Sequence, residues 1–148
     1  METIEHVTDI AAPVEDVWNV LIDVHSYPEW NPFLTIDHAP TAIGEQLVIT
    51  VRAGRRTMTF RPTVTALEAG REITWRGRFL IPGLCDGTHT LALEPLLNGH
   101  TRFHHREIFR GALVPFMPSL LRDTDAGFAA MNAAIAARVQ TRLATDTI

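Results

Sequence analysis

The hydrophobic period of the sequence changes near residue 110, and this change decides which folds the chain can adopt. Between residues 34 and 110, short segments of β-branched and apolar residues are separated by turn residues such as Gly54 and Gly70. Evenly interrupted segments of this kind are typical of an antiparallel meander. Beyond residue 115, apolar residues recur every three or four positions, at Phe128, Met131, Ile135, Val139 and Leu143. This spacing predicts one long amphipathic helix, whose apolar stripe must be buried against the sheet.

The other elements follow from turn and cap signals. Residues 3–10 predict a first strand, and Ala12-Pro13 predicts the start of a helix, because Pro at the first helical position costs no hydrogen bond. A short second helical turn is expected in the segment HSYPEWNPF. Further strands are predicted at 34–39, 45–53, 57–66, 71–80, 86–95 and 101–110. We therefore expect an α+β fold in which a seven-stranded antiparallel sheet wraps around a C-terminal helix within 115–145, with two short helices after the first strand.

The composition indicates one domain and excludes several kinds of chemistry. A chain of 148 residues with 46% hydrophobic and 20% charged residues fits a single globular domain over residues 1–148. All 13 basic residues are Arg, which excludes Schiff-base catalysis, Ser-Lys dyads and a Walker-type phosphate loop. Ser26 and Ser119 lie outside any Gly-x-Ser-x-Gly turn, and Cys85 is the only cysteine. Covalent nucleophilic catalysis is therefore disfavoured.

Charge and hydropathy limit the partners and the location. The formal charge of -4 and the pI near 5.9 disfavour a nucleic-acid partner. No apolar run approaches the about 18 residues of a membrane span, and the N-terminus lacks the basic and apolar regions of a secretory signal. We therefore expect no transmembrane segment and a cytoplasmic location. The sequence is compatible with a homodimer.

Three stretches of the sequence resemble a known superfamily. They are IAAPVEDVWNVLIDVHSYPEWNPF at 10–33, DGTHTLALEPLLNGHTRFHHREIFRGALVP at 86–115 and GFAAMNAAIAARV at 127–139. With the order of the elements, they resemble the SRPBCC superfamily of START domains and birch-pollen-allergen-like proteins, in particular its polyketide cyclase/dehydrase and lipid-transport type. The resemblance implies a helix-grip fold with a cavity between the sheet and the C-terminal helix. It does not fix the function, because the superfamily contains carriers, receptors, enzymes and co-chaperones.

Strand parity indicates which side chains face this cavity. The inward sets of 86–95 and 101–110 are His89, Leu91 and Leu93, and Phe103, His105, Glu107 and Phe109. A two-residue turn at Asn98-Gly99 would pair inward with outward residues, whereas a three-residue turn with Gly99 in the left-handed conformation keeps the alternation. We therefore predict that His89 lies opposite Glu107, within hydrogen-bond reach, and that Leu91 lies opposite His105.

The long helix carries a polar residue in its apolar stripe. Asn132 lies between Phe128 and Ile135 on the same helix face. Because a buried unpaired amide costs about 1–3 kcal/mol, we expect Asn132 to bond a cavity water, His89, Glu107 or a ligand. The alternative is that the side chain bonds its own helix or lies exposed at the rim of the cavity. The side chains expected to bind a ligand are Trp30, Asn31, Met58, Phe60, Trp75, Phe79, His89, Leu91, Phe103, His105, Glu107, Phe109, Phe128 and Asn132.

Three classes of function remain open. The first is the binding of a lipid-like, aromatic or polyketide-like molecule in an apolar cavity. The second is a cofactor-independent cyclase, dehydratase or isomerase in which His89 and Glu107 are the catalytic acid–base pair. The third is a co-chaperone or assembly factor, with residues 111–121 as a partner site; the same segment is alternatively an entrance lid or a bent lead-in to the helix. No metal is expected, because three bonds from His89, His105 and Glu107 to one ion would strain the sheet. No organic cofactor is expected either, because the sequence has no Lys, no exposed Ser nucleophile, no paired Cys and no close-spaced His cluster.

Overall fold

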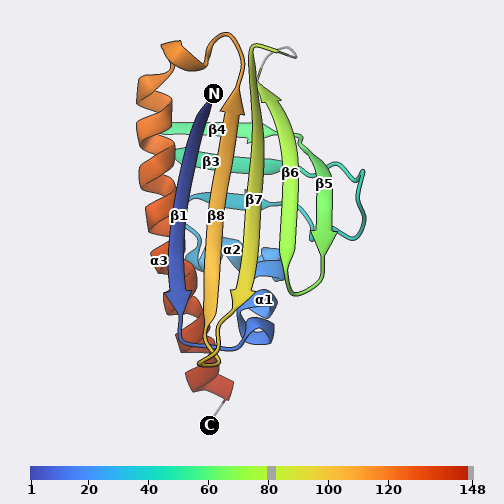
Figure 1. Ribbon diagram of the computed structural model, residues 1–148, viewed down its shortest axis with the longest axis vertical. Helices are drawn as coiled ribbons and strands as arrows, with labels where there is room; N and C mark the ends of the chain where they lie inside the picture. The colour runs from blue at the N-terminus through green and yellow to red at the C-terminus, as the bar shows by residue number, and fades with distance from the viewer. Residues whose placement is uncertain (80–82, 147–148) are drawn as a thin grey trace.

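The first strand of the chain pairs with the last strand, and the long helix follows directly after that last strand (Figure 1). The computed structural model describes residues 1–79 and 83–146. The strands are β1 (Glu2–Ile10), β2 (Leu34–Ile36), β3 (Ile49–Ala53), β4 (Arg56–Phe60), β5 (Thr63–Glu68), β6 (Glu72–Phe79), β7 (Cys85–Pro95) and β8 (Thr101–Arg110). The helices are α1 (Val14–Ile22), α2 (Tyr27–Trp30) and α3 (Pro118–Asp146), with short 3-10 turns η1 (Val24–Ser26) and η2 (Val114–Phe116).

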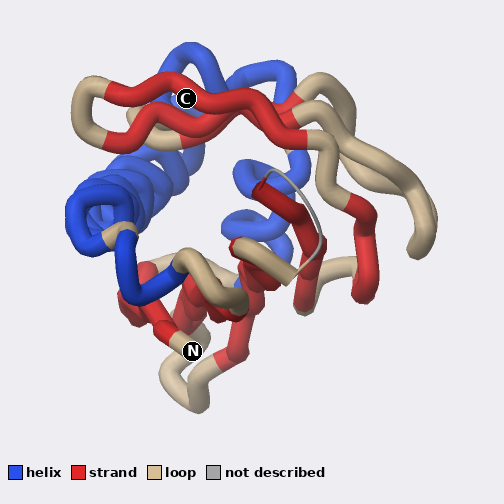
Figure 2. Tube along the Cα trace, turned by 90° about the horizontal axis from the view of Figure 1, so that it is seen from above, coloured by secondary structure: helices blue, strands red, loops and turns tan. Residues whose placement is uncertain are grey.

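The strands form two antiparallel sheets. The larger has the order β1-β8-β7-β6-β5, and the smaller has the order β2-β3-β4. Figure 2 shows the two sheets on opposite sides of the molecule, with α3 along the side between them. The α+β class and the long C-terminal helix are therefore as predicted, and the short helices follow β1 as expected.

The strand count differs from the prediction because the segment predicted as one strand at 57–66 is divided. It forms β4 and β5, separated by Arg61 and Pro62, and these strands belong to different sheets. Proline has no N–H to give to a ladder, so it marks the point where the chain leaves one sheet. The carbonyl of Pro62 accepts a hydrogen bond from the Leu47 N–H at 2.9 Å, which ties the crossover to the preceding segment. The result is eight strands rather than seven; the end of the predicted strand 71–80, at residue 80, lies outside the described residues.

The β7–β8 hairpin has the predicted turn and register. Gly99 has a φ of 81°, and the Leu96 N–H donates to the His100 carbonyl at 2.9 Å, closing a three-residue turn. His89 is paired with Glu107, and Leu91 with His105. The alternation along both strands therefore places the predicted polar pair on the face that α3 covers.

The apolar stripe of α3 is buried as its period predicts. Phe128, Met131, Ile135 and Val139 are at most 1% exposed. The helix packs on β1, β3 and α1. Its lead-in is the turn η2, and the helix itself begins at Pro118, where proline fits the first position. The closed interface between α3 and the sheets positions the site described next.

Candidate functional site

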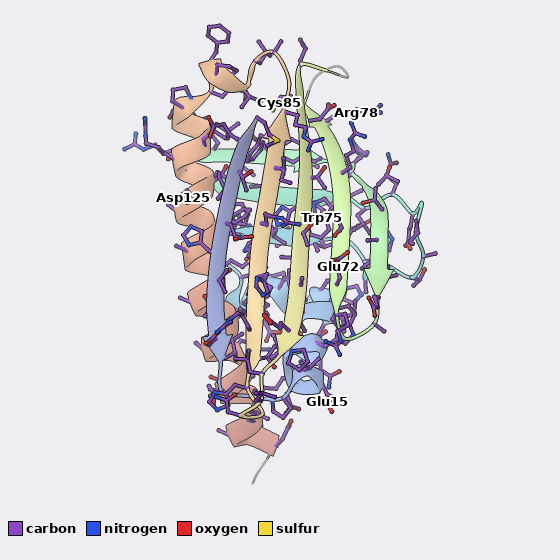
Figure 3. All side chains as sticks on the ribbon, in the orientation of Figure 1. Glu15, Glu72, Trp75, Arg78, Cys85 and Asp125 are labelled. Atoms are coloured by element: carbon purple, nitrogen blue, oxygen red, sulfur yellow. The ribbon has the colours of Figure 1, made fainter. Side chains whose placement is uncertain are left out.

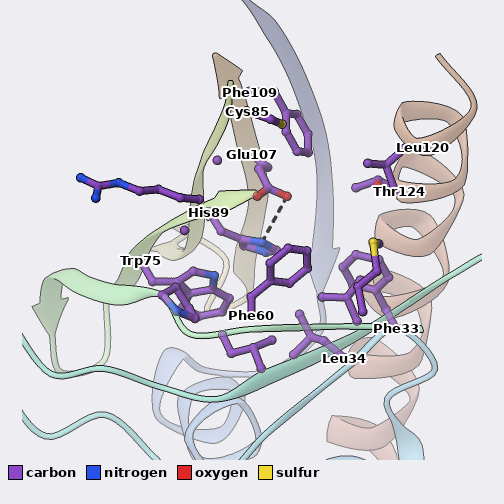
Figure 4. Close-up of a pocket in the computed structure, with 17 residues that line it drawn as sticks. Phe33, Leu34, Phe60, Trp75, Cys85, His89, Glu107, Phe109, Leu120 and Thr124 are labelled. Atoms are coloured by element: carbon purple, nitrogen blue, oxygen red, sulfur yellow. Dashed lines mark ion pairs between the residues drawn. The ribbon is translucent and has the colours of Figure 1, made fainter. Parts of the chain in front are cut away.

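A cavity of about 80 Å³ lies between the two sheets and the first turns of α3. This volume has room for several water molecules. Figure 4 shows the side chains around it, most of them apolar or aromatic. Its walls are Phe33, Leu34, Ile49, Val51, Met58, Phe60, Pro62, Trp75, Gly77, Arg78, Cys85, Gly87, His89, Glu107, Phe109, Leu120 and Thr124.

Two facing glycines create part of this space. Gly77 on β6 and Gly87 on β7 are cross-strand partners, and both line the cavity. A Cβ atom on Gly87 would lie 2.5 Å from Oε2 of Glu107. Gly87 therefore makes room for this carboxylate, which a larger residue would displace.

His89 and Glu107 form the polar wall of the cavity. Nδ1 of His89 lies 3.5 Å from Oε1 of Glu107, which is an ion-pair distance rather than the direct hydrogen bond predicted (Figure 4). The His89 ring is held by the indole of Trp75, which stacks on it at 4.7 Å between ring centres. The two polar groups thus converge on one apolar space, which is an arrangement suited to orienting a ligand.

A chain of hydrogen bonds runs from His89 away from the cavity. Nε2 of His89 lies 2.8 Å from Nε2 of His105, and Nδ1 of His105 lies 2.9 Å from Oδ1 of Asn132. Nδ2 of Asn132 donates to the carbonyl of His6 at 3.2 Å and to Oγ1 of Thr8 at 3.1 Å. The predicted partners of Asn132 were therefore wrong: its amide pairs with His105 and β1, because α3 packs directly on β1.

His105 is the centre of this chain and is fully buried. The ring of Phe128 stacks on it at 3.7 Å with 10° between the ring planes. Burial, and then the neighbouring His89, lower the pKa of His105 well below its ordinary value, against the hydrogen bond with Asn132. His105 is therefore a neutral imidazole at neutral pH.

Cys85 is a buried thiol at the end of the sheet where α3 begins, and Arg78 lies at the same end (Figure 3). Burial raises the pKa of the Cys85 thiol, and the charges of Glu107 and Asp86 add to this effect. The group therefore stays a thiol at neutral pH. In the described part of the chain, no three His, Cys, Asp or Glu side chains are arranged to share a metal ion.

The structure separates the predicted site residues into two groups. Lining the cavity are Met58, Phe60, Trp75, His89, Glu107 and Phe109. Buried outside its walls are Asn31, Leu91, Phe103, His105, Phe128 and Asn132. Position along the helix explains the last two, because Leu120 and Thr124, in the first turns of α3, reach the cavity, whereas Phe128 and Asn132 lie further along the helix.

Asn31 and Trp30, which were predicted to bind the ligand, do not line the cavity. Asn31 is a turn residue, since its Oδ1 accepts the N–H groups of Phe33 and Leu34 at 2.9 and 3.0 Å. Trp30 packs edge-on against Tyr27 at 5.0 Å between ring centres, away from the cavity walls. The side chain of Phe79 lies outside the described residues.

Several residues of the cavity wall were not predicted from the sequence. On β7, Cys85 and Gly87 share the parity of His89, so the alternation used for His89 would have found both. Ile49 and Val51 on β3 carry the same period-2 signal. Leu120 and Thr124 had no such signal, because their position depends on where α3 crosses the sheets.

The comparisons with known proteins agree with this architecture. The chain belongs to the polyketide cyclase/dehydrase and lipid-transport family, whose model matches residues 1–145. A comparison with curated proteins gives no match. No helix in the described part of the chain is long and apolar enough to cross a membrane.

Solved structures with the same fold share little sequence with the chain. The Zhui aromatase/cyclase from Streptomyces sp. R1128 is 18% identical, with a TM-score of 0.74 over 96% of this chain and 95% of that one. A START superfamily protein from Mycobacterium smegmatis is 19% identical, with a TM-score of 0.68 over 94% and 97%. Ara h 8.0201 is 14% identical, with a TM-score of 0.71 over 95% and 98%. These similarities show the helix-grip fold of the SRPBCC superfamily.

Proposed function

We propose that the protein binds a small hydrophobic molecule, of lipid-like, aromatic or polyketide-like character, in the cavity between the sheets and α3. The observation that carries the proposal is the cavity itself, whose mostly apolar walls enclose the single His89–Glu107 pair. Burying an apolar ligand there contributes about 25 cal/mol per Å² of surface removed from water. The two polar groups then hold the polar end of the ligand.

The cavity has a route to solvent in this proposal. Arg78 lines the cavity and is itself exposed, so the space reaches the surface beside it. A ligand would enter at this end, with its apolar part between Met58, Phe60 and Trp75. The family description, which names both lipid transport and polyketide cyclisation, is consistent with a ligand of this class.

A second candidate function is a cofactor-independent cyclase, dehydratase or isomerase acting on such a molecule. It is favoured by one observation, the 3.5 Å approach of an imidazole nitrogen and a carboxylate oxygen inside a mostly apolar cavity. This pair would move a proton at a bound substrate, with one group accepting it and the other returning it.

The single cysteine provides a direct test of binding. Cys85 lines the cavity, so its alkylation by iodoacetamide reports whether the cavity is occupied. We expect 1-naphthol, used as a hydrophobic probe, to slow alkylation of the folded protein in a saturable manner. Native mass spectrometry of the freshly purified protein should show a bound small molecule of the same class. Unchanged alkylation rates across a panel of aromatic and fatty-acid probes, with no co-purifying molecule, would contradict the proposal.

A conservative variant separates binding from catalysis. Glu107→Gln keeps the shape of the side chain and removes its charge, and Glu94→Gln on the solvent side of β7 is the matched control. If Glu107 anchors the ligand, the variant loses affinity by up to about 3 kcal/mol, with no reaction to lose. Turnover of a candidate polyketide by the wild type, lost in Glu107→Gln without weaker binding, would instead establish the enzyme.

A further inference from the structure

The amide of Asn132 has only one orientation that satisfies its neighbours. The backbone carbonyl of His6 can only accept a hydrogen bond, so the group facing it at 3.2 Å must be the Nδ2 donor of Asn132. Oδ1 of Asn132 therefore faces Nδ1 of His105 at 2.9 Å as an acceptor. A backbone group of β1 thus sets the direction of the first hydrogen bond in the chain.

This direction fixes the tautomer of His105. Its Nδ1 must carry the proton that is donated to Asn132. His105 is neutral because it is fully buried beneath Phe128, so its Nε2 carries no proton and can only accept. The donor in the 2.8 Å contact between the two Nε2 atoms is therefore His89.

His89 is left with one titratable nitrogen. Its Nε2–H is committed to His105, and its Nδ1 faces Oε1 of Glu107 at 3.5 Å on the cavity side. Asn132 and His105 do not line the cavity, and His105 contacts the wall residue His89, so they act as positioning residues for His89. The other titratable groups near this chain are His6, beside His105, and the Cys85 thiol, beside Glu107 and Asp86. The positively charged Arg78 lines the same cavity.

The number of protons shared by Nδ1 of His89 and the carboxyl group of Glu107 decides how many hydrogen-bond acceptors face the cavity. If Nδ1 of His89 carries a proton, both oxygens of Glu107 remain acceptors. If the carboxyl group carries it instead, one oxygen still accepts, and with no proton on either group all three atoms accept. In each of these three states the pair offers the cavity at least one unfilled acceptor.

We propose that this hydrogen-bond chain makes the inner end of the cavity an acceptor site, which selects hydrophobic molecules bearing a hydroxyl group, a phenol or an alcohol. Ligands whose polar end is a carbonyl or an ether have no hydrogen to donate, so they leave the acceptors unpaired. This inference rests on the proposed function for its ligand, but the tautomers on which it depends exist without one.

The first test needs no ligand. Long-range ¹H–¹⁵N correlation spectra of the histidine-labelled protein at pH 7 should show His105 protonated at Nδ1 alone and His89 carrying a proton at Nε2. His104→Gln, on the outer face of β8, serves as the assignment control and should leave both patterns unchanged. A His105 ring protonated at Nε2 would overturn the inference, whatever the protein binds.

The second test compares two probes of nearly the same shape, 1-naphthol and 1-methylnaphthalene. The methyl compound is the more hydrophobic, so a preference for naphthol reports the acceptor site. We expect naphthol to bind roughly tenfold more tightly. Equal affinities would overturn the selectivity while leaving the binding function intact, and failure of both probes to bind would count against both.

A variant of Asn132 tests whether the hydrogen-bond chain determines the selectivity for a hydroxyl group. Asn132→Leu removes the acceptor that holds the proton on Nδ1 of His105, so His105 can adopt the other tautomer and donate to Nε2 of His89. His89 then carries its proton on Nδ1 and directs it at Oε1 of Glu107, so Nδ1 no longer accepts and only Oε2 of Glu107 stays unfilled. The preference for naphthol should therefore weaken, whereas His104→Gln should keep it. A preference unchanged in folded Asn132→Leu would overturn the positioning role; if the variant does not fold, the wild-type spectra and probe comparison decide the inference.

Discussion

The interface between α3 and the sheets has a closed half and an open half, which the same strand helps to build. Phe103 and His105 on β8 are both fully buried, and His105 contacts the closed half of α3 at Phe128 and Asn132. Two residues further along the same face, Glu107 begins the open half and lines the cavity. The strand does not change direction or parity between them, so the difference comes from what lies opposite.

The side chains opposite decide whether the space is filled. In the closed half, the ring of Phe33 reaches α3 at Gly127 and packs against Phe128 at 5.4 Å between ring centres. In the open half, the neighbouring strands present Gly77 and Gly87, which have no side chains. The closed half therefore contributes stability, and the open half leaves space for a ligand.

The largest effect is expected from Phe128→Ala in the closed half. It removes a fully buried ring that stacks on His105, and such truncations cost about 3–5 kcal/mol. Leu120→Ala, on the same helix but at the cavity wall, should cost about 1 kcal/mol, because this side chain is only partly buried. Denaturant unfolding of the two variants measures both values. Equal losses would remove the distinction between the two halves.

Gly127→Ala should destabilise the closed half although alanine is the better helix former. Its Cβ would lie 2.2 Å from the Phe33 ring, and overpacking of this kind costs about 1–3 kcal/mol. The gain in helix propensity, about 1 kcal/mol, does not offset the clash with a buried ring. Ala130→Gly, at an exposed position of α3, measures the difference in helix propensity between alanine and glycine alone. A stabilised Gly127→Ala protein would show that Phe33 is free to move.

The closed half should also make stability depend on pH. The pKa of His105 is lowered by burial in the folded state, so below pH 6.5 the unfolded chain takes up a proton that the folded protein does not. Stability contributed by neutral His105 is thus present above pH 6.5 and is lost as the pH falls, by at most about 1.4 kcal/mol per pH unit.

This dependence is measured by denaturant unfolding between pH 7 and 5, together with an NMR titration of the His105 ring. The partly buried His38 gives the opposite sign, since hydrogen bonds to Asp37 and Glu45 raise its pKa and its contribution is lost as the pH rises. Titration of His105 at the ordinary value of a histidine would contradict the burial argument.

The sequence predicted the features that depend on local repeats better than those that depend on packing between distant elements. Period and parity identified the buried stripe of α3 and the pairing of His89 with Glu107, because both depend on local repeats and one turn. They did not predict the partner of Asn132, which depends on how α3 crosses β1. They also missed the cavity wall at Gly77 and Gly87, because parity was applied to apolar and polar side chains and not to residues without one.

The smallest effect on stability, and a large one on binding, is expected from Gly87→Ala. The new Cβ would lie 2.5 Å from Oε2 of Glu107, and the carboxylate is the end of a flexible side chain, so it rotates away while the sheet stays in place. The free energy of unfolding should therefore change by less than about 1 kcal/mol. The affinity for 1-naphthol should fall roughly tenfold, because the displaced carboxylate no longer accepts its hydroxyl.

Gly77→Ala is the matched control for this last variant. It adds the same methyl group to the facing strand, and its Cβ would meet only Pro62 at an ordinary contact distance of 3.6 Å. Both variants reduce the cavity by the same amount, so a loss of affinity in Gly87→Ala alone isolates the position of Glu107 from the volume of the space. Equal losses in the two variants would show that the open half selects ligands by size alone, and the polar wall would then have no part in binding.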